Sequence, residues 1–515
     1  MARSSLSFTF ALATVTLLLL GAAATPVSAQ SPQVGGLATT PSTTPKQKEY
    51  PEVKDAITAL NNNDFPGAIK SLEKAAKKNS ELPPENILMF LLVRERNPAL
   101  ARSQLESAVH NAPNDPEAYI ILGSIALQER RVTEATMLFD KAKQLLEKYS
   151  ANADRKAAME QQVLSGVAEV AEANASNSDF NTDRQLEEWK TAETRLRDLV
   201  KLAPDNLQGR QRLARALFWQ GKAPDAYIVL KDAKKIDHDN AQKNKTEEVF
   251  PIPEAVMAQY YEQYEGVKAD DTKHPKTWFD AALVKAPKHL LTRLIVAQWA
   301  FEKGNIAFAK EQADAAVKIE ESDTAKYAGS NVGHMLRGVV ALWEHRWADA
   351  EKDFEAVILQ APRDFNARNN LALALVEQKD DANKQRRALE YAQNNYADTQ
   401  TNQNLKDRRG DALSTLGWVY FCRGEFDQAR LALEEFIKAT AGRSNNPDMA
   451  TYWAHILHHS EKDWEAKELL EKILGTKRPF FMRSEAEKLL AKVKDAKKPA
   501  EPAAGTGAAP KASSP

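Results

Sequence analysis

Apolar residues recur at helical spacing through most of the chain, in short runs that come in pairs. Residues 411–439 show the pattern clearly, because each of two runs carries one apolar face and Gly424 closes the first run. The apolar positions are Leu413, Leu416, Val419 and Tyr420 in the first run, and Phe426, Ala429, Leu433 and Phe436 in the second. Neither helix can bury its apolar face alone, so the pattern predicts helix pairs that stack on further pairs.

Variants of this pair return at a fixed distance along the chain. Ala101, Leu105 and Ala108 recur 34 residues later as Ala135, Phe139 and Ala142. This spacing, with Gly123 in the first helix and Pro113 ending the second, resembles the tetratricopeptide repeat family and its W-x2-L-G-x2-Y, A-x3-F and closing Pro pattern. The resemblance covers roughly residues 49–475, in about ten units. It implies an all-α fold, an α-solenoid of helix-turn-helix repeats.

The remaining stretches divide the chain further. A helix followed by a polar loop interrupts the period in residues 150–188, and residues 237–246 look like a second polar insertion. The predicted segments are a signal peptide at 1–29, a disordered linker at 30–48, repeats at 49–149, a divergent repeat with an insertion at 150–188, repeats at 189–475, a capping helix at 476–496 and a disordered Pro/Ala-rich tail at 497–515.

Residues 1–29 have the layout of an export signal. Arg3 precedes an apolar run over residues 8–24, and small residues follow up to Ala29, where we expect cleavage. An uncleaved membrane anchor is the alternative, although the run is short for a span. No other stretch is apolar enough to cross a membrane, and the single cysteine, Cys422, precludes an intramolecular disulfide. The sequence therefore predicts an exported bacterial protein of the periplasm, or a secreted one.

Charge and motifs narrow the function. The 70 basic and 71 acidic residues nearly cancel, which argues against nucleic acid as a partner. The sequence carries no P-loop, no dinucleotide fingerprint, no nucleophile elbow and no paired-cysteine metal site. We therefore expect a non-enzymatic protein without a cofactor.

Two features keep other chemistry open. His455, His458 and His459 lie on one predicted helix and could offer two imidazoles to a metal, but a third ligand is missing nearby, so a polar helix face is the preferred interpretation. Cys422 has only Arg423 beside it to lower its pKa, so a packed thiol is preferred over a reactive one.

The family resemblance implies where a partner would bind. In that family the first helices line a concave groove, and five places of each unit point into it. On this sequence those places hold Phe218, Trp219, Gln298, Phe301, Met335, Leu342, Trp343, Asn369, Trp418, Phe421, His455 and His458. Aromatic residues with few charges are typical of contacts with protein or sugar, although several of these residues could equally pack between units.

Some family members clamp a carboxylate with paired Lys and Asn at the fifth and ninth places. Here these places hold Gln211 with Arg215, Leu294 with Gln298, and Asn369 with Leu373, so the clamp is missing. The leading hypothesis is a scaffold or adaptor that holds a protein or extended peptide in the groove. The alternative is a component of an envelope export or assembly machine that contacts polysaccharide. An enzyme with a site in an insertion is the third class.

Overall fold

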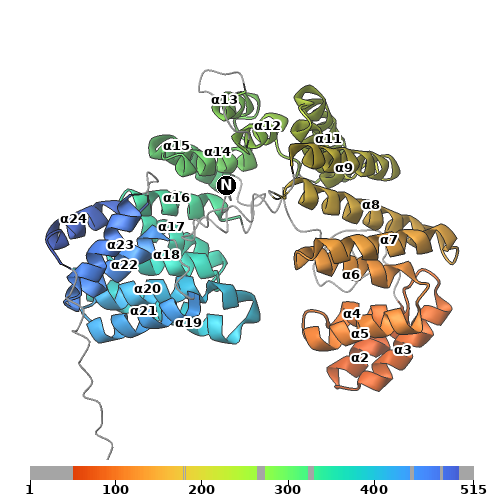
Figure 1. Cartoon of the computed structure of the whole chain (residues 1–515), viewed down its shortest axis with the longest axis horizontal. Coiled ribbons are helices and arrows are strands. Elements are labelled where there is room, and N and C mark those ends of the chain that lie inside the picture. Colours follow the sequence, from red (N-terminus) through yellow and green to blue (C-terminus); the bar gives the residue numbers. More distant parts are fainter. Residues whose placement is uncertain are drawn as a thin grey trace, which may run out of the picture. The chain divides into compact units, whose positions relative to one another are not determined.

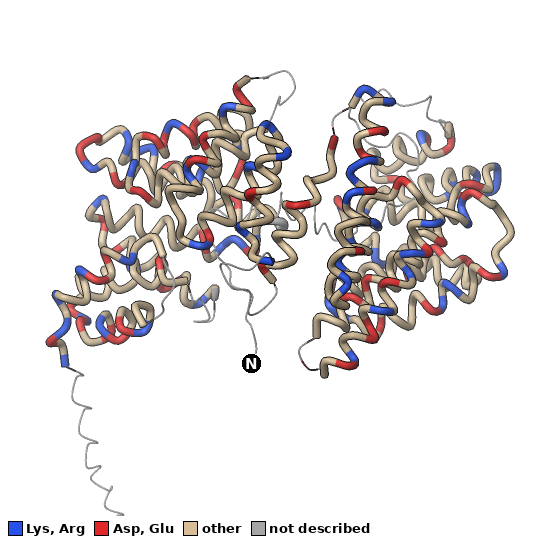
Figure 2. Tube along the Cα trace, turned by 90° about the horizontal axis from the view of Figure 1, so that it is seen from above, with Lys and Arg blue, Asp and Glu red and all other residues tan. Residues whose placement is uncertain are grey.

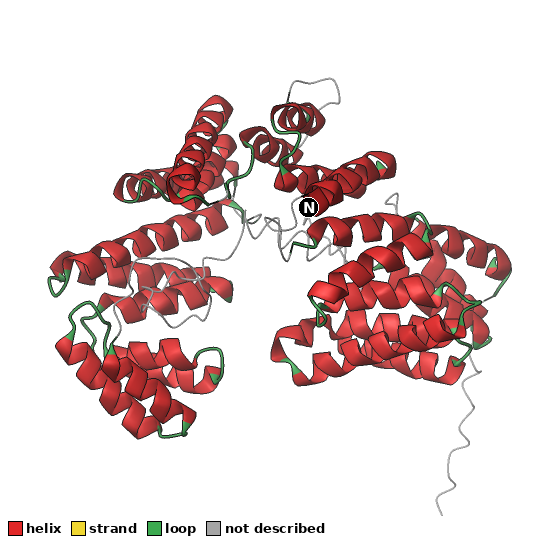
Figure 3. Cartoon of the chain, turned by 180° about the vertical axis from the view of Figure 1, so that it is seen from behind, coloured by secondary structure: helices red, strands yellow, loops and turns green. Residues whose placement is uncertain are grey.

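The structure, a computed structural model, describes residues 50–497 except 178, 180, 247, 264–272, 323–329, 441–445 and 476–479. The expected signal peptide, the linker and residues 498–515 of the expected tail lie outside the described residues. Within the described ranges the chain forms 23 α-helices and one 3-10 helix, with no strand (Figure 3). The prediction of an all-α solenoid is confirmed.

The chain divides into two compact units, which meet in sequence between Pro287 and Lys288. Unit 1 contains α2 (Pro51–Asn61), α3 (Phe65–Lys78), α4 (Glu85–Val93), α5 (Pro98–Asn111), α6 (Pro116–Gln128), α7 (Val132–Lys148), α8 (Ala153–Ala175), α9 (Thr182–Leu202), α10 (Leu207–Trp219), α11 (Ala223–Asn244), α12 (Pro253–Gln263) and α13 (Pro275–Lys285) (Figure 1). Each even-numbered helix packs on the odd-numbered helix that follows it, as expected for a helix-turn-helix array.

Unit 2 continues the alternation. It contains α14 (Leu290–Glu302), α15 (Ile306–Ser322), α16 (Val332–Trp343), α17 (Trp347–Gln360), α18 (Phe365–Val376), α19 (Ala382–Thr401), η1 (Gln403–Arg408), α20 (Arg409–Cys422), α21 (Phe426–Thr440), α22 (Pro447–His459), α23 (Asp463–Leu474) and α24 (Arg483–Val493). The expected capping helix at 476–496 corresponds to α24, which packs on both α22 and α23.

The same type of backbone turn joins the two helices in seven of the pairs. The middle residue of each of these three-residue turns has positive φ, and these residues are Asn63, Arg130, Gly221, Gly304, His345, Gly424 and Glu461. The next residue donates its N–H to a carbonyl five residues earlier, as Glu425 N does to Tyr420 O at 2.9 Å. This bond satisfies a carbonyl that the helix end leaves free.

Small residues let the helices of a pair approach closely. A Cβ on Gly338 would lie 2.7 Å from Phe354 Cε1, and one on Gly417 would lie 2.8 Å from Leu433 Cγ. Phe139 of α7 touches two such glycines, since Cβ atoms on Gly123 and Gly166 would lie 3.0 and 2.3 Å from its Cζ. These large residues therefore occupy the space that the glycines leave open.

The two expected insertions need correction. Residues 237–244 are the end of α11, because Asp237 and Ala241 are buried one turn apart and hold the polar stretch in a helix. Asp237 accepts hydrogen bonds from the backbone N–H groups of Val249 and Phe250 at 3.0 and 2.8 Å. Near residue 174, α8 runs on to Ala175, so the connection to α9 is shorter than the expected loop. Helix replaces most of the insertion expected at residues 237–246, whereas the loop between α8 and α9 is only shortened, since α8 ends at Ala175 and α9 begins at Thr182.

Candidate binding face

The first helices of the unit 2 pairs lie side by side. Contacts join α14 to α16, α16 to α18, α18 to α20, and α20 to α22, so these five helices form one continuous row. We call α14, α16, α18, α20 and α22 the first-helix row. It is the part of unit 2 on which the sequence places most of the expected binding residues.

The C-terminal part of this row carries an aromatic cluster built from α20 and α22. Trp418 stacks on Tyr452 with ring centroids 4.4 Å apart, and on Phe421 at 5.4 Å. His455 lies against Trp418 and Phe421 at 5.6 and 5.7 Å. The rings come from adjacent repeats, so this cluster joins two units of the array and leaves Phe421 and His455 half-buried.

A second cluster forms at the ends of α14 and α16. Phe301 meets Trp343 edge to face at 5.1 Å. The rings of Phe481, His345 and Trp347 extend this cluster. The ring centroid of Phe481 lies 6.5 Å from that of Trp343, 5.4 Å from that of His345 and 6.0 Å from that of Trp347. Phe481 precedes α24, so this cluster brings the end of the described chain to the turn between α16 and α17.

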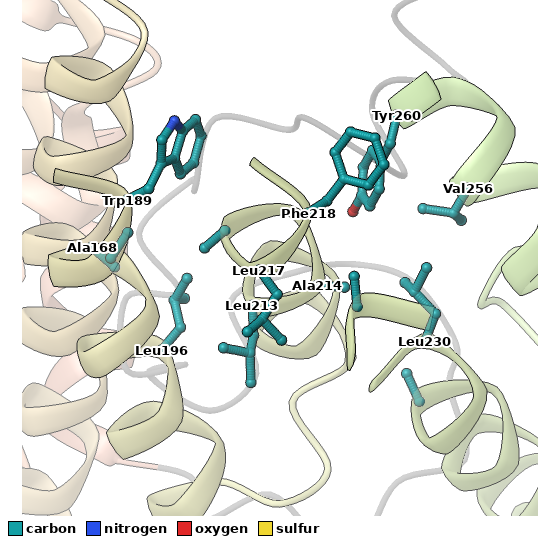
Figure 4. Packing of buried hydrophobic residues seen from close by; sticks show 14 of the residues in the cluster. Ala168, Trp189, Leu196, Leu213, Ala214, Leu217, Phe218, Leu230, Val256 and Tyr260 are labelled. Carbon is teal, nitrogen blue, oxygen red and sulfur yellow. The ribbon is translucent and has the colours of Figure 1, made fainter. Parts of the chain in front are cut away.

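In unit 1 the expected residue Phe218 belongs to a large apolar core (Figure 4), and the expected residue Trp219 packs against that core. Phe218 lies 5.4 Å from Tyr260 and 5.0 Å from Tyr261, and it is buried. Trp219 stacks on Trp189 at 6.2 Å and is half-buried. These aromatic residues therefore join α9, α10 and α12 within unit 1.

Burial keeps the C-terminal part of the first-helix row weakly charged. It raises the pKa of the Glu377 carboxyl, which accepts a hydrogen bond from Trp418 Nε1 at 2.9 Å. Burial lowers the pKa of His455 to about 4, so this ring is neutral near pH 7. It also raises the pKa of Asp448 to about 7 and that of the Cys422 thiol. The thiol is therefore protonated at neutral pH, in agreement with the packed interpretation of this cysteine.

Several buried polar atoms on α18 and α20 have no hydrogen-bond partner within the part of the chain that the structure describes. They include Oδ1 and Nδ2 of Asn370, Oδ1 of Asn369, the Ser414 Oγ and the Thr415 Oγ1. Asn370 is only 1% exposed. An unsatisfied buried polar group costs about 1–3 kcal/mol, so these atoms lower the stability of the centre of the row.

The twelve residues expected to bind a partner fall into two groups. Seven are buried among the described residues: Phe218, Gln298, Phe301, Met335, Leu342, Asn369 and Trp418. Five keep a half-exposed surface: Trp219, Trp343, Phe421, His455 and His458. The structure brings Phe301 to Trp343, and Trp418 to Phe421 and His455. Contact of these residues with a partner stays a prediction.

Sequence reasoning missed Tyr452, Asn370, Trp347 and Phe481. Tyr452 and Asn370 lie one residue beyond the places that the family resemblance assigns to the groove, so the chosen places excluded them. Phe481 could have been noticed, because Phe480, Phe481 and Met482 form an apolar run in an otherwise polar terminal stretch. The repeat pattern does not predict that Phe481 contacts the α16–α17 turn.

The three C-terminal histidines are engaged separately. His458 Nδ1 lies 2.6 Å from Asp463 Oδ1, and His459 stacks on Phe426 at 3.5 Å. Among the described residues no group of three or more His, Cys, Asp or Glu side chains could hold a metal ion. The histidines thus have structural contacts of their own.

Basic and acidic residues alternate along both units rather than collecting in one stripe (Figure 2). Many ion pairs join residues close in sequence, such as Lys276 with Asp280 at 2.6 Å on α13. Across the residues that the structure describes, no helix combines the length and apolar character needed to cross a membrane.

Comparisons with known proteins agree with the repeat pattern. A family model described as tetratricopeptide repeat matches residues 90–153 and 336–383. A comparison with curated proteins gives no match. Among solved structures, yeast Tom70 is similar over 86% of this chain and 95% of its own, with 14% identity and a TM-score of 0.32.

Two further structures show similar values. A chain of the APC/C hetero-tetramer Cut9-Hcn1 is 13% identical over 85% of this chain and 88% of its own, with a TM-score of 0.37. A tetratricopeptide repeat protein from Parabacteroides merdae is 12% identical over 64% of this chain and 99% of its own, with a TM-score of 0.36. The family-model matches fall in both units, so each unit contains a stretch that is similar to the tetratricopeptide repeat.

Proposed function

We propose that this protein is a non-enzymatic scaffold that binds an extended segment of another protein on the first-helix row of unit 2. The observation that carries the proposal is the aromatic surface of this row, where Trp343 on α16 and Phe421 on α20 remain half-exposed.

This aromatic surface favours a protein partner. Both rings lie in clusters with other aromatic side chains, Trp343 with Phe301 and Phe421 with Trp418. Aromatic residues dominate the binding energy of many protein interfaces, while backbone hydrogen bonds set the direction of the chain. An extended peptide would place an apolar side chain against these rings.

We also propose that the protein acts in the bacterial envelope. The export-like pattern of residues 1–29 supports action in the bacterial envelope, where the partner would also reside. The closing experiment is therefore made with envelope extract rather than with total lysate.

The test compares three baits made from residues 30–515. They are the natural sequence, a Trp343→Ala/Phe421→Ala double variant, and a Phe65→Ala/Trp464→Ala control whose substitutions lie on α3 and α23, outside the first-helix row. Partners are identified by mass spectrometry, and the bound segment is then made as a synthetic peptide and titrated on each purified bait.

We expect one discrete protein on the natural and control baits, and a synthetic peptide whose affinity falls at least about tenfold for the double variant. Equal affinity for all three baits would exclude the first-helix row as the site. Retention of glycan without protein would favour the polysaccharide-handling alternative instead.

A further inference from the structure

The segment before α24 lies on the same face that the proposed partner would use. Phe481 is half-buried between the ring of His345, which stacks on it with an interplanar angle of 22°, and Trp347, which meets it edge to face. Trp343 completes this aromatic site from the end of α16. One aromatic side chain is thus held by three rings.

The backbone of this segment is also held. The N–H of Met482 donates to Asp448 Oδ1, near the start of α22, at 2.7 Å. Phe480 and Met482, on either side of Phe481, are each 3% exposed. The segment therefore presents one ring to α16 and α17 while its backbone is anchored on α22, at the other end of the first-helix row.

A capping role alone does not explain these contacts. Covering the last apolar face of the array requires only contact with α22 and α23, which α24 provides. The ring of Phe481 instead reaches the α16–α17 turn, more than 130 residues earlier in sequence. The segment behaves as a bound peptide does, with an anchored backbone and a side chain inserted between aromatic residues.

We propose that residues 480–482 are an internal ligand of unit 2, and that a partner binds by displacing them. This inference rests on the proposed function and names the partner's chemistry: an extended polypeptide that places a phenylalanine among Trp343, His345 and Trp347 and donates a backbone N–H to Asp448. Occupation by the chain's own segment lowers the apparent affinity for that partner in proportion to the time the site is filled.

The test uses the chain's own sequence as the probe. A fluorescent peptide of residues 478–488, RPFFMRSEAEK, is titrated by anisotropy into the natural protein and into a Phe481→Ala variant of the full chain from residue 30. The Phe481→Leu variant is measured as well, because it keeps most of the apolar volume should the alanine variant lose its fold. Circular dichroism verifies the helical content of each protein.

Phe65→Ala serves as the matched control, because it removes an equally large ring from the start of α3 in unit 1. A Trp347→Ala/Phe481→Ala double variant tests whether the probe uses the proposed aromatic site. We expect the probe to bind at least one Phe481 variant about tenfold or more tighter than the natural protein or the control, and to lose that gain in the double variant.

Equal binding to the natural protein and to both Phe481 variants would overturn the inference, and so would a gain that survives loss of Trp347. These outcomes are independent of the proposed function, which depends on capture of a partner by the first-helix row. Loss of partner capture with retained probe binding would overturn the proposed function and leave the internal ligand in place.

Discussion

In seven turns between paired helices, the middle residue shows how a single backbone angle can set the repeat. Seven turns use positive φ, three of them through glycine and four through Asn63, Arg130, His345 and Glu461. For L-residues with a side chain this conformation costs about 1–2 kcal/mol, except that Asn tolerates it better. The four turns without glycine therefore carry backbone strain, and the three turns with glycine avoid it.

Gly424 offers a clean measure of this strain. Its φ is +79°, and an added Cβ would meet no atom within 4 Å, so Gly424→Ala introduces no clash and changes only the backbone preference. We expect it to lower the free energy of unfolding by about 1 kcal/mol, measured in urea. Gly475→Ala, at φ −63°, is the control and should change stability by less than about 0.5 kcal/mol. An equal loss at both glycines would contradict the argument.

Asp448 predicts a pH dependence of stability. Its folded pKa is about 7, raised by burial from 3.8, so the folded state favours the protonated carboxyl. The stabilisation it gives is complete below about pH 4 and is lost as pH rises through about 7. Asp448→Asn keeps an oxygen acceptor for Met482 N–H and cannot ionise, so its stability relative to the natural protein should increase between about pH 4 and pH 8.

Urea midpoints of the two proteins across this range measure the effect. Buried His455 shifts stability in the opposite direction, because its lowered pKa costs stability as pH falls below 6.5 towards 4. That contribution is present in both proteins and cancels in the comparison. A difference that stays constant with pH would show that Asp448 ionises normally in the folded protein.

At the scale of elements, the helix pair formed by α20 and α21 is packed without spare volume. Ala429 is fully buried on α21, and Gly417 of α20 approaches Leu433. We expect Ala429→Leu to lower the free energy of unfolding by about 1–3 kcal/mol through overpacking. Ala439→Leu on the exposed side of the same helix is the control and should be nearly neutral. A neutral Ala429→Leu, judged by its urea midpoint, would mean that the pair can separate at no cost.

Elements with one apolar face were predictable from the sequence, and those without one were harder to identify. The α20–α21 pair and its Gly424 turn follow from periodicity, as does a terminal helix. Helix α4 has apolar residues almost all round, since Ile87, Leu88, Met89 and Phe90 are buried in succession, so no periodic signal marks it. The polar end of α11 gave the opposite error, because only Asp237 and Ala241 face the core there.

The candidate site was predictable in part for a similar reason. Repeat positions indicate which side of a first helix faces the row, and they selected Trp343, Phe421 and Asn369. They do not indicate what covers that side. Phe481 comes from outside the repeats, and its aromatic contacts depend on the path of the chain after α23.

For the whole molecule, the division at Pro287 and Lys288 predicts two independently folding parts. Each unit contains its own helix pairs and its own buried core, and repeats gain stability from their neighbours. We expect polypeptides of residues 30–287 and 288–515 each to be helical by circular dichroism and to unfold cooperatively on heating. A fragment that stays unfolded at low temperature would show that its fold requires the other part.

The contact between Phe481 and the α16–α17 turn changes how unit 2 can come apart. Linear repeat arrays fray from their ends, because a terminal repeat has one neighbour and no distant contact. Here Phe481, just before the last helix, contacts a turn three repeats earlier, so the end of the array has a distant contact as well as its neighbour. Amide hydrogens of α22 to α24 should consequently exchange together with those of α16. Removing the Phe481 ring would allow this end to fray independently.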